Sequence, residues 1–362
     1  MVLASWTREG IRLDIVSVMA TTMLASIDKI VEAGRLGPPS DPWDTNGLDD
    51  HADVGSLGME TLLIIGGSGL IGSKVAALAS ESFKVTATYR EKKPKIPRVE
   101  FTVLHKERVE DGMALVRATK PAFVVDTAAA HNVDRCEEER DIAWQMNAGS
   151  TGALARVATD VGARYLFVST DFVFDGRKGR YREEDVPRPV NYYGETKLAG
   201  EHAVLAATAD HLVVRPSVIY GWDDKRLNFG TWVLSSARSG TPINVATDWI
   251  GSPTFADDLA AGIIRLLRVP DGGVYHLAGG DALSRYDFAV RLLRAFDLDP
   301  TIAHPVRTEE LHLKAPRPAD SSLSSAKAKR HRITLLTADD GIRAMKRQRG
   351  LDSFATPARF DP

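Results

Sequence analysis

Hydrophobic and polar positions alternate regularly from residue 60 onward. Short apolar runs rich in β-branched residues have the length of buried strands, and the longer segments between them have helical periodicity. Six strands are predicted, at residues 62–65, 84–89, 99–104, 122–126, 164–169 and 211–215. Helices are predicted between them, at residues 74–82, 109–119, 141–161 and 193–207. This order predicts an α/β fold, a Rossmann-type doubly wound parallel sheet with helices on both faces.

The alternation loosens after Gly221. Further helices are predicted at residues 229–239, 255–267, 284–296 and 339–348, with short strands at residues 243–245 and 274–277. We interpret residues 59–221 as the Rossmann domain and residues 222–362 mainly as a smaller C-terminal lobe. Parts of this lobe are expected to return to the Rossmann domain.

The first 58 residues have a different character. Residues 11–31 fit one amphipathic helix, but a Gly-Pro-Pro-Ser-Asp-Pro run at residues 37–42 ends it and an acidic, aperiodic stretch follows. We predict a poorly ordered N-terminal extension over residues 1–58, with a docked N-terminal helix as the alternative. Met59 stands directly before the first strand, so one hypothesis makes it the natural start of the protein.

Composition narrows the class of protein. The chain has 362 residues, 44% of them hydrophobic, and a net charge of -2, which gives no electrostatic reason to expect nucleic acid or a membrane as partner. Apolar runs stay well short of the roughly 20 residues of a spanning helix. One cysteine, Cys136, fits a reducing cytoplasm. The nine histidines show no metal-ligand spacing, so no metal site is predicted.

A glycine-rich turn, G-x-x-G-x-x-G, joins the first predicted strand to its helix. Strand, glycine turn and helix together form the arrangement that binds a pyrophosphate, because the helix start offers free N–H groups and a positive dipole end. The spacing differs from the G-x-G-x-x-G of most dehydrogenases. Glycine turns also join strands to helices without binding a ligand. The predicted phosphate-binding residues are Gly66, Ser68, Gly69, Leu70, Ile71 and Gly72.

The residues after the second strand indicate which dinucleotide binds. The acid that usually ends this strand and bonds the ribose 2′-hydroxyl is missing, and Tyr89-Arg90 stands there, followed by Lys92 and Lys93. A cation suits a 2′-phosphate, so NADP(H) is preferred and NAD(H) remains possible. Arg90 is the predicted contact, and a solvated basic loop is the alternative.

Three groups of residues follow successive strands, where open α/β sheets bind ligands. Small side chains at Ala128, Ala129 and Ala130 leave room for a flat cofactor. Thr170 follows the fifth strand, and Tyr193 and Lys197 lie four apart on one face of the next helix.

This trio predicts carbonyl reduction or its reverse. The Lys197 cation is expected to lower the pKa of the Tyr193 phenol, which then gives a proton to a carbonyl oxygen, while Thr170 donates a hydrogen bond to that oxygen. Asp171 either contacts a substrate hydroxyl or caps a local turn. The C-terminal lobe then becomes the substrate lobe.

Several motifs together resemble the extended short-chain dehydrogenase/reductases, and more closely the dTDP-4-dehydrorhamnose reductase group. They are the glycine turn, Ser-Thr-Asp-Phe-Val-Phe-Asp-Gly at residues 169–176, Tyr-Gly-Glu-Thr-Lys-Leu-Ala-Gly-Glu at residues 193–201, and later blocks at residues 215–221, 251–254 and 317–321. The resemblance implies an NADP(H)-dependent reductase of a nucleotide-linked 4-keto-6-deoxy sugar. It also implies a possible homodimer, and in some members Mg²⁺, which we cannot place in this chain.

Three departures from that group's pattern lie around the expected sugar, and a fourth lies near the adenine. Val218 replaces a substrate-contacting Trp, Trp249-Ile250 stands where Gln is common, and Arg285 replaces the Trp of a Ser-Trp pair. An acid near the adenine is replaced around His105. Val218, Thr170 and Asp171 are the predicted substrate contacts.

Two other functions fit the same motifs. The regulatory subunit of methionine adenosyltransferase resembles these reductases, binds NADP and shares the Tyr-Arg-Glu-Glu-Asp run at residues 181–185. An epimerase of the extended short-chain group is the third possibility.

Overall fold

The computed structural model describes residues 59–349. The expectations about residues 1–58, an ordered helix, a poorly ordered extension or a start at Met59, therefore lie outside the described residues. The described residues group into one compact unit.

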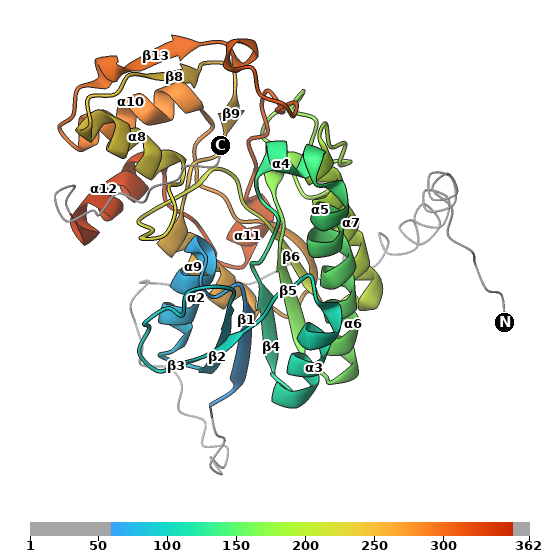
Figure 1. The fold of residues 1–362 in the computed structure, drawn as a ribbon. Helices are drawn as coiled ribbons and strands as arrows, with labels where there is room; N and C mark the ends of the chain where they lie inside the picture. The colour runs from blue at the N-terminus through green and yellow to red at the C-terminus, as the bar shows by residue number, and fades with distance from the viewer. Residues whose placement is uncertain (1–58, 350–362) are drawn as a thin grey trace, which may run out of the picture. The chain divides into compact units, whose positions relative to one another are not determined.

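A seven-stranded parallel sheet forms the centre of this unit (Figure 1). The strand order is β11-β6-β5-β4-β1-β2-β3. The strands are β1 (Thr61–Ile65), β2 (Lys84–Tyr89), β3 (Val99–Val103), β4 (Phe123–Asp126), β5 (Arg164–Val168), β6 (Leu212–Arg215) and β11 (Gly273–His276). The order reverses between β1 and β4, and ligands of doubly wound sheets bind outside the carboxyl ends of the strands at such a point. The predicted Rossmann-type fold is confirmed.

Helices cover both faces of the sheet. Successive side chains of a strand point to opposite faces, and apolar side chains on both faces need to be covered. Leu62 and Ile64 pack with α2 (Leu70–Ala79) and α9 (Ala256–Leu266). The alternate residues Leu63 and Ile65 belong to the core of the opposite face. That face carries the helices α3 (Val109–Thr119), α6 (Ser150–Asp160) and α7 (Tyr192–Ala207).

Two helices differ from the sequence prediction. Helix α2 begins at Leu70 instead of residue 74, so Leu70, Ile71 and Gly72 lie inside its first turn. The long helix predicted at residues 141–161 is divided into α5 (Arg140–Trp144), a π-helical turn (Gln145–Gly149) and α6. Such turns insert one extra residue into a helix and often occur at functional sites.

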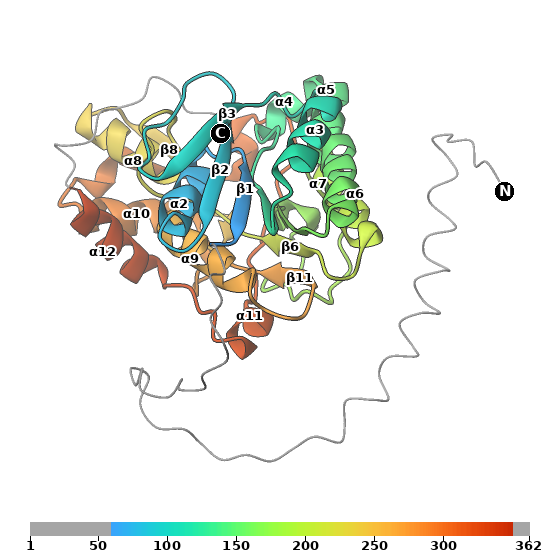
Figure 2. The same ribbon diagram turned by 90° about the horizontal axis from the view of Figure 1, so that it is seen from below.

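A smaller lobe lies beyond the carboxyl ends of the strands (Figures 1 and 2). Its core contains residues of α8 (Phe229–Arg238), α10 (Arg285–Ala295) and α12 (Ala338–Gln348), with β8 (Ile243–Ala246) paired to β13 (Ala303–Val306). Three two-stranded ribbons include β7 (Ile219–Tyr220) with β10 (Thr254–Phe255), and β9 (Ile250–Gly251) with β12 (Leu283–Ser284). The chain also returns to the large sheet, because β11 and α9 come from after residue 221.

Candidate active site

The glycine turn has the geometry of a phosphate-binding loop. Gly66 has a φ of +91°, a conformation that side chains rarely adopt. A Cβ on Gly72 would lie 2.2 Å from the Gly66 carbonyl oxygen, so only glycine lets α2 approach the turn this closely. A Cβ on Gly69 would meet nothing nearer than the Gly66 oxygen at 3.5 Å. This open space beside the start of α2 fits a dinucleotide pyrophosphate.

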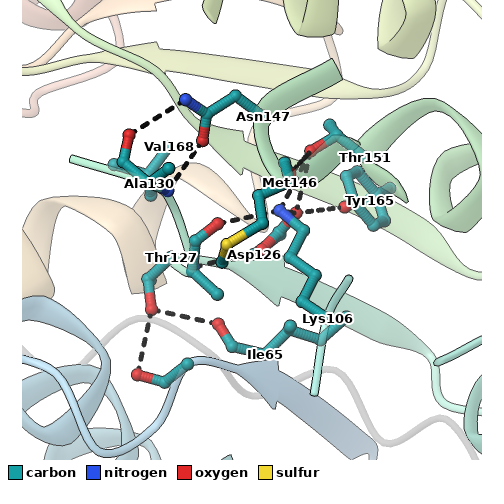
Figure 3. A network of polar contacts seen from close by, with 12 residues as sticks. Ile65, Lys106, Asp126, Thr127, Ala130, Met146, Asn147, Thr151, Tyr165 and Val168 are labelled. Atoms are coloured by element: carbon teal, nitrogen blue, oxygen red, sulfur yellow. Dashed lines mark hydrogen bonds and ion pairs between the residues drawn. The ribbon is translucent and has the colours of Figure 1, made fainter. Parts of the chain in front are cut away.

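A buried ion pair supports the neighbouring loop after β4 (Figure 3). Lys106 Nζ lies 2.6 Å from Asp126 Oδ2, and both side chains are almost completely buried. Lys106 also donates to the Ala128 carbonyl oxygen at 2.8 Å, and Tyr165 donates its hydroxyl to Asp126 Oδ2 at 2.6 Å. The pair therefore fixes the end of β4 and the first residue of the small-residue loop.

Asn147, on the π-helical turn, holds the other end of this loop. Its side-chain amide accepts from the Ala130 N–H at 2.9 Å and donates to the Ala130 carbonyl at 3.0 Å (Figure 3). It also donates to Thr196 Oγ1 of α7 at 3.0 Å. The sequence analysis missed both residues, since a single polar residue has no periodic signal, either between a strand and a helix (Lys106) or within a helix (Asn147).

The structure places Thr170, Tyr193 and Lys197 together at the carboxyl edge of β5. Helix α7 begins just before Tyr193, where the Asn191 side chain accepts from the Gly194 N–H at 2.8 Å. Lys197, one turn later, donates to the Val168 carbonyl at 2.7 Å, and its Nζ lies 3.9 Å from the centre of the Phe167 ring.

Burial controls the protonation of this trio. It raises the pKa of Tyr193, and the hydrogen bond with Thr170 offsets this only in part. Burial, with a smaller contribution from the Lys106 cation, lowers the pKa of Lys197 to about 7. The pKa of Tyr193 is therefore raised and not lowered as expected, because desolvation of the phenolate outweighs the hydrogen bond with Thr170.

Asp171 and Val218 occupy constrained positions beside Thr170. Burial raises the pKa of Asp171, whose carboxylate accepts from Ser217 Oγ at 2.8 Å, Ser321 Oγ at 2.5 Å and Thr170 Oγ1 at 3.2 Å. Val218 has a φ of +43°, a strained backbone for a β-branched residue. Strain of this kind is often found at functional sites.

Cationic side chains lie at the carboxyl end of β2 and beside the glycine turn. Arg90 follows β2, is half exposed, and pairs with Glu107 at 3.3 Å. Lys225, from the smaller lobe, donates to the carbonyls of Ser68 and Lys92, each at 3.2 Å. The sequence analysis missed Lys225, which lies in a loop more than 130 residues from both partners.

The comparisons with known proteins identify the family. Residues 59–347 match the family described as the RmlD substrate binding domain. This chain belongs to that family. The dTDP-4-dehydrorhamnose reductase of Escherichia coli is 35% identical over 230 residues, which cover 59% of this chain and 74% of that protein. Methionine adenosyltransferase 2 subunit beta of Rattus norvegicus is 32% identical over 275 residues, covering 74% of this chain and 80% of that protein.

A solved structure agrees with the sequence relatives. The dTDP-4-dehydrorhamnose reductase from Bacillus anthracis, crystallised in complex with NADP, superimposes with a TM-score of 0.71 at 27% identity. The match covers 80% of this chain and 99% of that chain. The protein is thus an RmlD-like NAD(P)-dependent oxidoreductase of the extended short-chain type, and the resemblance drawn from its motifs is confirmed.

Residues 59–349 contain neither a candidate membrane span nor a candidate metal cluster. None of the helices there combines the length and the hydropathy that crossing a membrane requires. No group of three or more His, Cys, Asp or Glu side chains in the same residues could hold a metal ion.

Proposed function

We propose that this RmlD-like protein is an NADP(H)-dependent reductase that acts on a nucleotide-linked 4-keto-6-deoxy sugar. The observation that carries the proposal is the grouping of Thr170, Tyr193 and Lys197 at the carboxyl edge of β5. The glycine turn opens two strands away along the same sheet edge. A dinucleotide held by that turn can extend to the trio, and the nicotinamide supplies the hydride when the cofactor is bound.

Each side chain of the trio has a role in the proposed reaction. Thr170 donates a hydrogen bond to the keto oxygen as negative charge develops there. Tyr193, whose phenol is protonated at neutral pH, gives its proton to the same oxygen. Lys197 binds the nicotinamide ribose and its cation stabilises the tyrosinate that proton transfer leaves behind.

The preference for NADP(H) rests on charge at the adenosine end. Arg90 is exposed and takes the place of the acid that NAD-binding folds use. Lys225 adds a second cation beside the glycine turn. Both favour a ligand with an additional 2′-phosphate.

Turnover of NADPH with dTDP-4-keto-6-deoxyglucose, followed at 340 nm, tests the proposal. Oxidation of NADPH supports it. A second candidate is the regulatory role implied by the resemblance to the methionine adenosyltransferase subunit, since methionine adenosyltransferase 2 subunit beta of Rattus norvegicus is 32% identical to this chain. Tight NADPH binding without oxidation by any 4-keto sugar nucleotide would favour that role. Interconversion of sugar nucleotides without net NADPH consumption would instead point to an epimerase.

The resemblance also supports a homodimer, and the single cysteine supports a cytoplasmic protein. Light scattering of the purified full chain tests the first of these proposals. Fractionation of the native cell tests the second.

A further inference from the structure

Two residues that depart from the reductase pattern contact each other in the smaller lobe. The Arg285 guanidinium carbon lies 4.4 Å from the centre of the Trp249 ring and 5.4 Å from that of Phe229. Among residues 59–349, its guanidinium forms no hydrogen bond and no ion pair. The third departure, Val218, is near, because an added Cβ on Gly251 would lie 2.6 Å from Val218 Cγ2 and 3.9 Å from Arg285 Nη1.

A second arginine stacks on the same indole. The Arg317 guanidinium carbon lies 5.5 Å from the Trp249 ring centre, and its side chain is only 1% exposed. Arg317 Nη1 donates to Asp134 Oδ1 at 2.9 Å and to the Ala315 carbonyl at 2.8 Å. Within the described residues, its Nε and Nη2 are buried without a hydrogen-bond partner, and so is Nε1 of Trp249.

All the unpaired groups of this cluster are donors. A buried donor without a partner costs about 1–3 kcal/mol, and native structures contain few of them. Asp171 is the carboxylate that faces Arg285, but its oxygens already accept from Thr170, Ser217 and Ser321. A ligand with acceptor oxygens can therefore satisfy the unpaired N–H donors of this cluster. The two guanidinium groups favour a ligand that is negatively charged.

The cluster lies one aromatic ring away from the trio. The Phe172 ring centre is 6.3 Å from that of Trp249 and 5.9 Å from that of Tyr193. An acceptor bound between the two arginines would therefore lie close to a substrate whose keto oxygen is at Tyr193.

We propose that Arg285, Arg317 and the Trp249 N–H bind an oxyanion of the substrate, and that Arg285 makes this site a specificity determinant of this chain. The oxyanion is either the diphosphate of the sugar nucleotide or a carboxylate carried by the sugar. This inference rests on the proposed function, since it takes the substrate to be a sugar nucleotide.

The experiment is calorimetric titration of the full chain with dTDP, UDP-glucose and UDP-glucuronate, for the wild type and Arg285→Met. The substitution should leave the fold intact, because the Arg285 guanidinium has no hydrogen bond or ion pair within residues 59–349 to lose, and the backbone bond from its N–H to the Trp249 carbonyl is kept. The matched control is Arg294→Met, which removes an exposed arginine from the same helix. Loss of a charge-assisted contact should weaken binding about tenfold or more.

The three ligands distinguish the two sources of the oxyanion. A loss of affinity for all three ligands in Arg285→Met assigns the site to the diphosphate. A loss restricted to UDP-glucuronate assigns it to a sugar carboxylate. Equal affinities in wild type, Arg285→Met and Arg294→Met, or no binding to the wild type, would overturn the proposal. Because binding is measured without turnover, a failed reductase assay does not affect the binding result. Equal affinities in the binding experiment likewise leave the reductase assay unaffected.

Discussion

Tyr193 and Lys197 show how strongly burial acts on individual side chains. Their spacing was readable from the sequence, but their protonation was not, because desolvation depends on residues from several strands. Lys197 packs on Phe167 and shares its surroundings with Lys106, so its pKa falls to about 7. A bound cofactor adds hydroxyl groups and charge to this region. We expect the reactive protonation states to be established only when the cofactor is bound.

Arg90 is the residue through which cofactor choice is best tested. In Arg90→Ser we expect the KM for NADPH to rise about tenfold and the KM for NADH to stay within about twofold, since only NADPH loses a charge-assisted hydrogen bond. Steady-state kinetics with both cofactors measures this. Arg98→Ser is the control, because Arg98 pairs with Glu81 on another loop. Equal effects on the two cofactors would count against a 2′-phosphate contact.

At the scale of elements, the loop after β4 is fixed from both ends. The Lys106–Asp126 pair holds Ala128 and the π-helical turn holds Ala130 through Asn147.

The strands and most helices were predictable because their apolar patterns repeat along the chain. The π-helical turn was not, since it depends on a contact between Asn147 and a loop seventeen residues earlier.

Removing one partner of the buried pair should destabilise the protein. In Lys106→Met the Asp126 charge stays buried without its cation, which typically costs about 3–5 kcal/mol. Urea unfolding should show this loss in the free energy of unfolding. The double variant Lys106→Met/Asp126→Asn should recover most of it, because the uncompensated charge is gone. A single variant as stable as the wild type would show that the pair is not a structural support.

At the scale of the whole described chain, segments that follow residue 221 complete the sheet formed by the strands before it. Strand β11 pairs with β6, and α9 packs against α2, although both follow residue 221. The sequence predicted that the chain returns to the Rossmann domain but not where, because strands that pair across a long stretch of sequence leave no local pattern.

His276, at the end of β11, lies where this strand joins the sheet. Burial and the neighbouring Arg215 lower its pKa to about 3.

His276 should make stability depend on acid. Its ordinary pKa is 6.5, so between pH 6.5 and about 3 the unfolded chain binds a proton that the folded chain excludes. The free energy of unfolding should therefore fall as the pH falls through this range. Arg215, Tyr181 and Asp185 lie around the ring, Glu183 accepts from the His276 backbone N–H, and none of the four changes in a His276→Gln variant. Urea unfolding at pH 7, 5.5 and 4.5 should show a shallower fall in that variant, and parallel curves would contradict this origin.

The central claim is that Tyr193 protonates the keto oxygen of a sugar nucleotide. The most direct test is the rate of NADPH oxidation by Tyr193→Phe with dTDP-4-keto-6-deoxyglucose, together with NADPH affinity. Tyr286→Phe, which removes a phenol from α10, is the control. We predict that kcat falls by about a hundredfold or more in Tyr193→Phe while NADPH binds as in the wild type. A Tyr193→Phe variant that turns over at the wild-type rate would contradict the account.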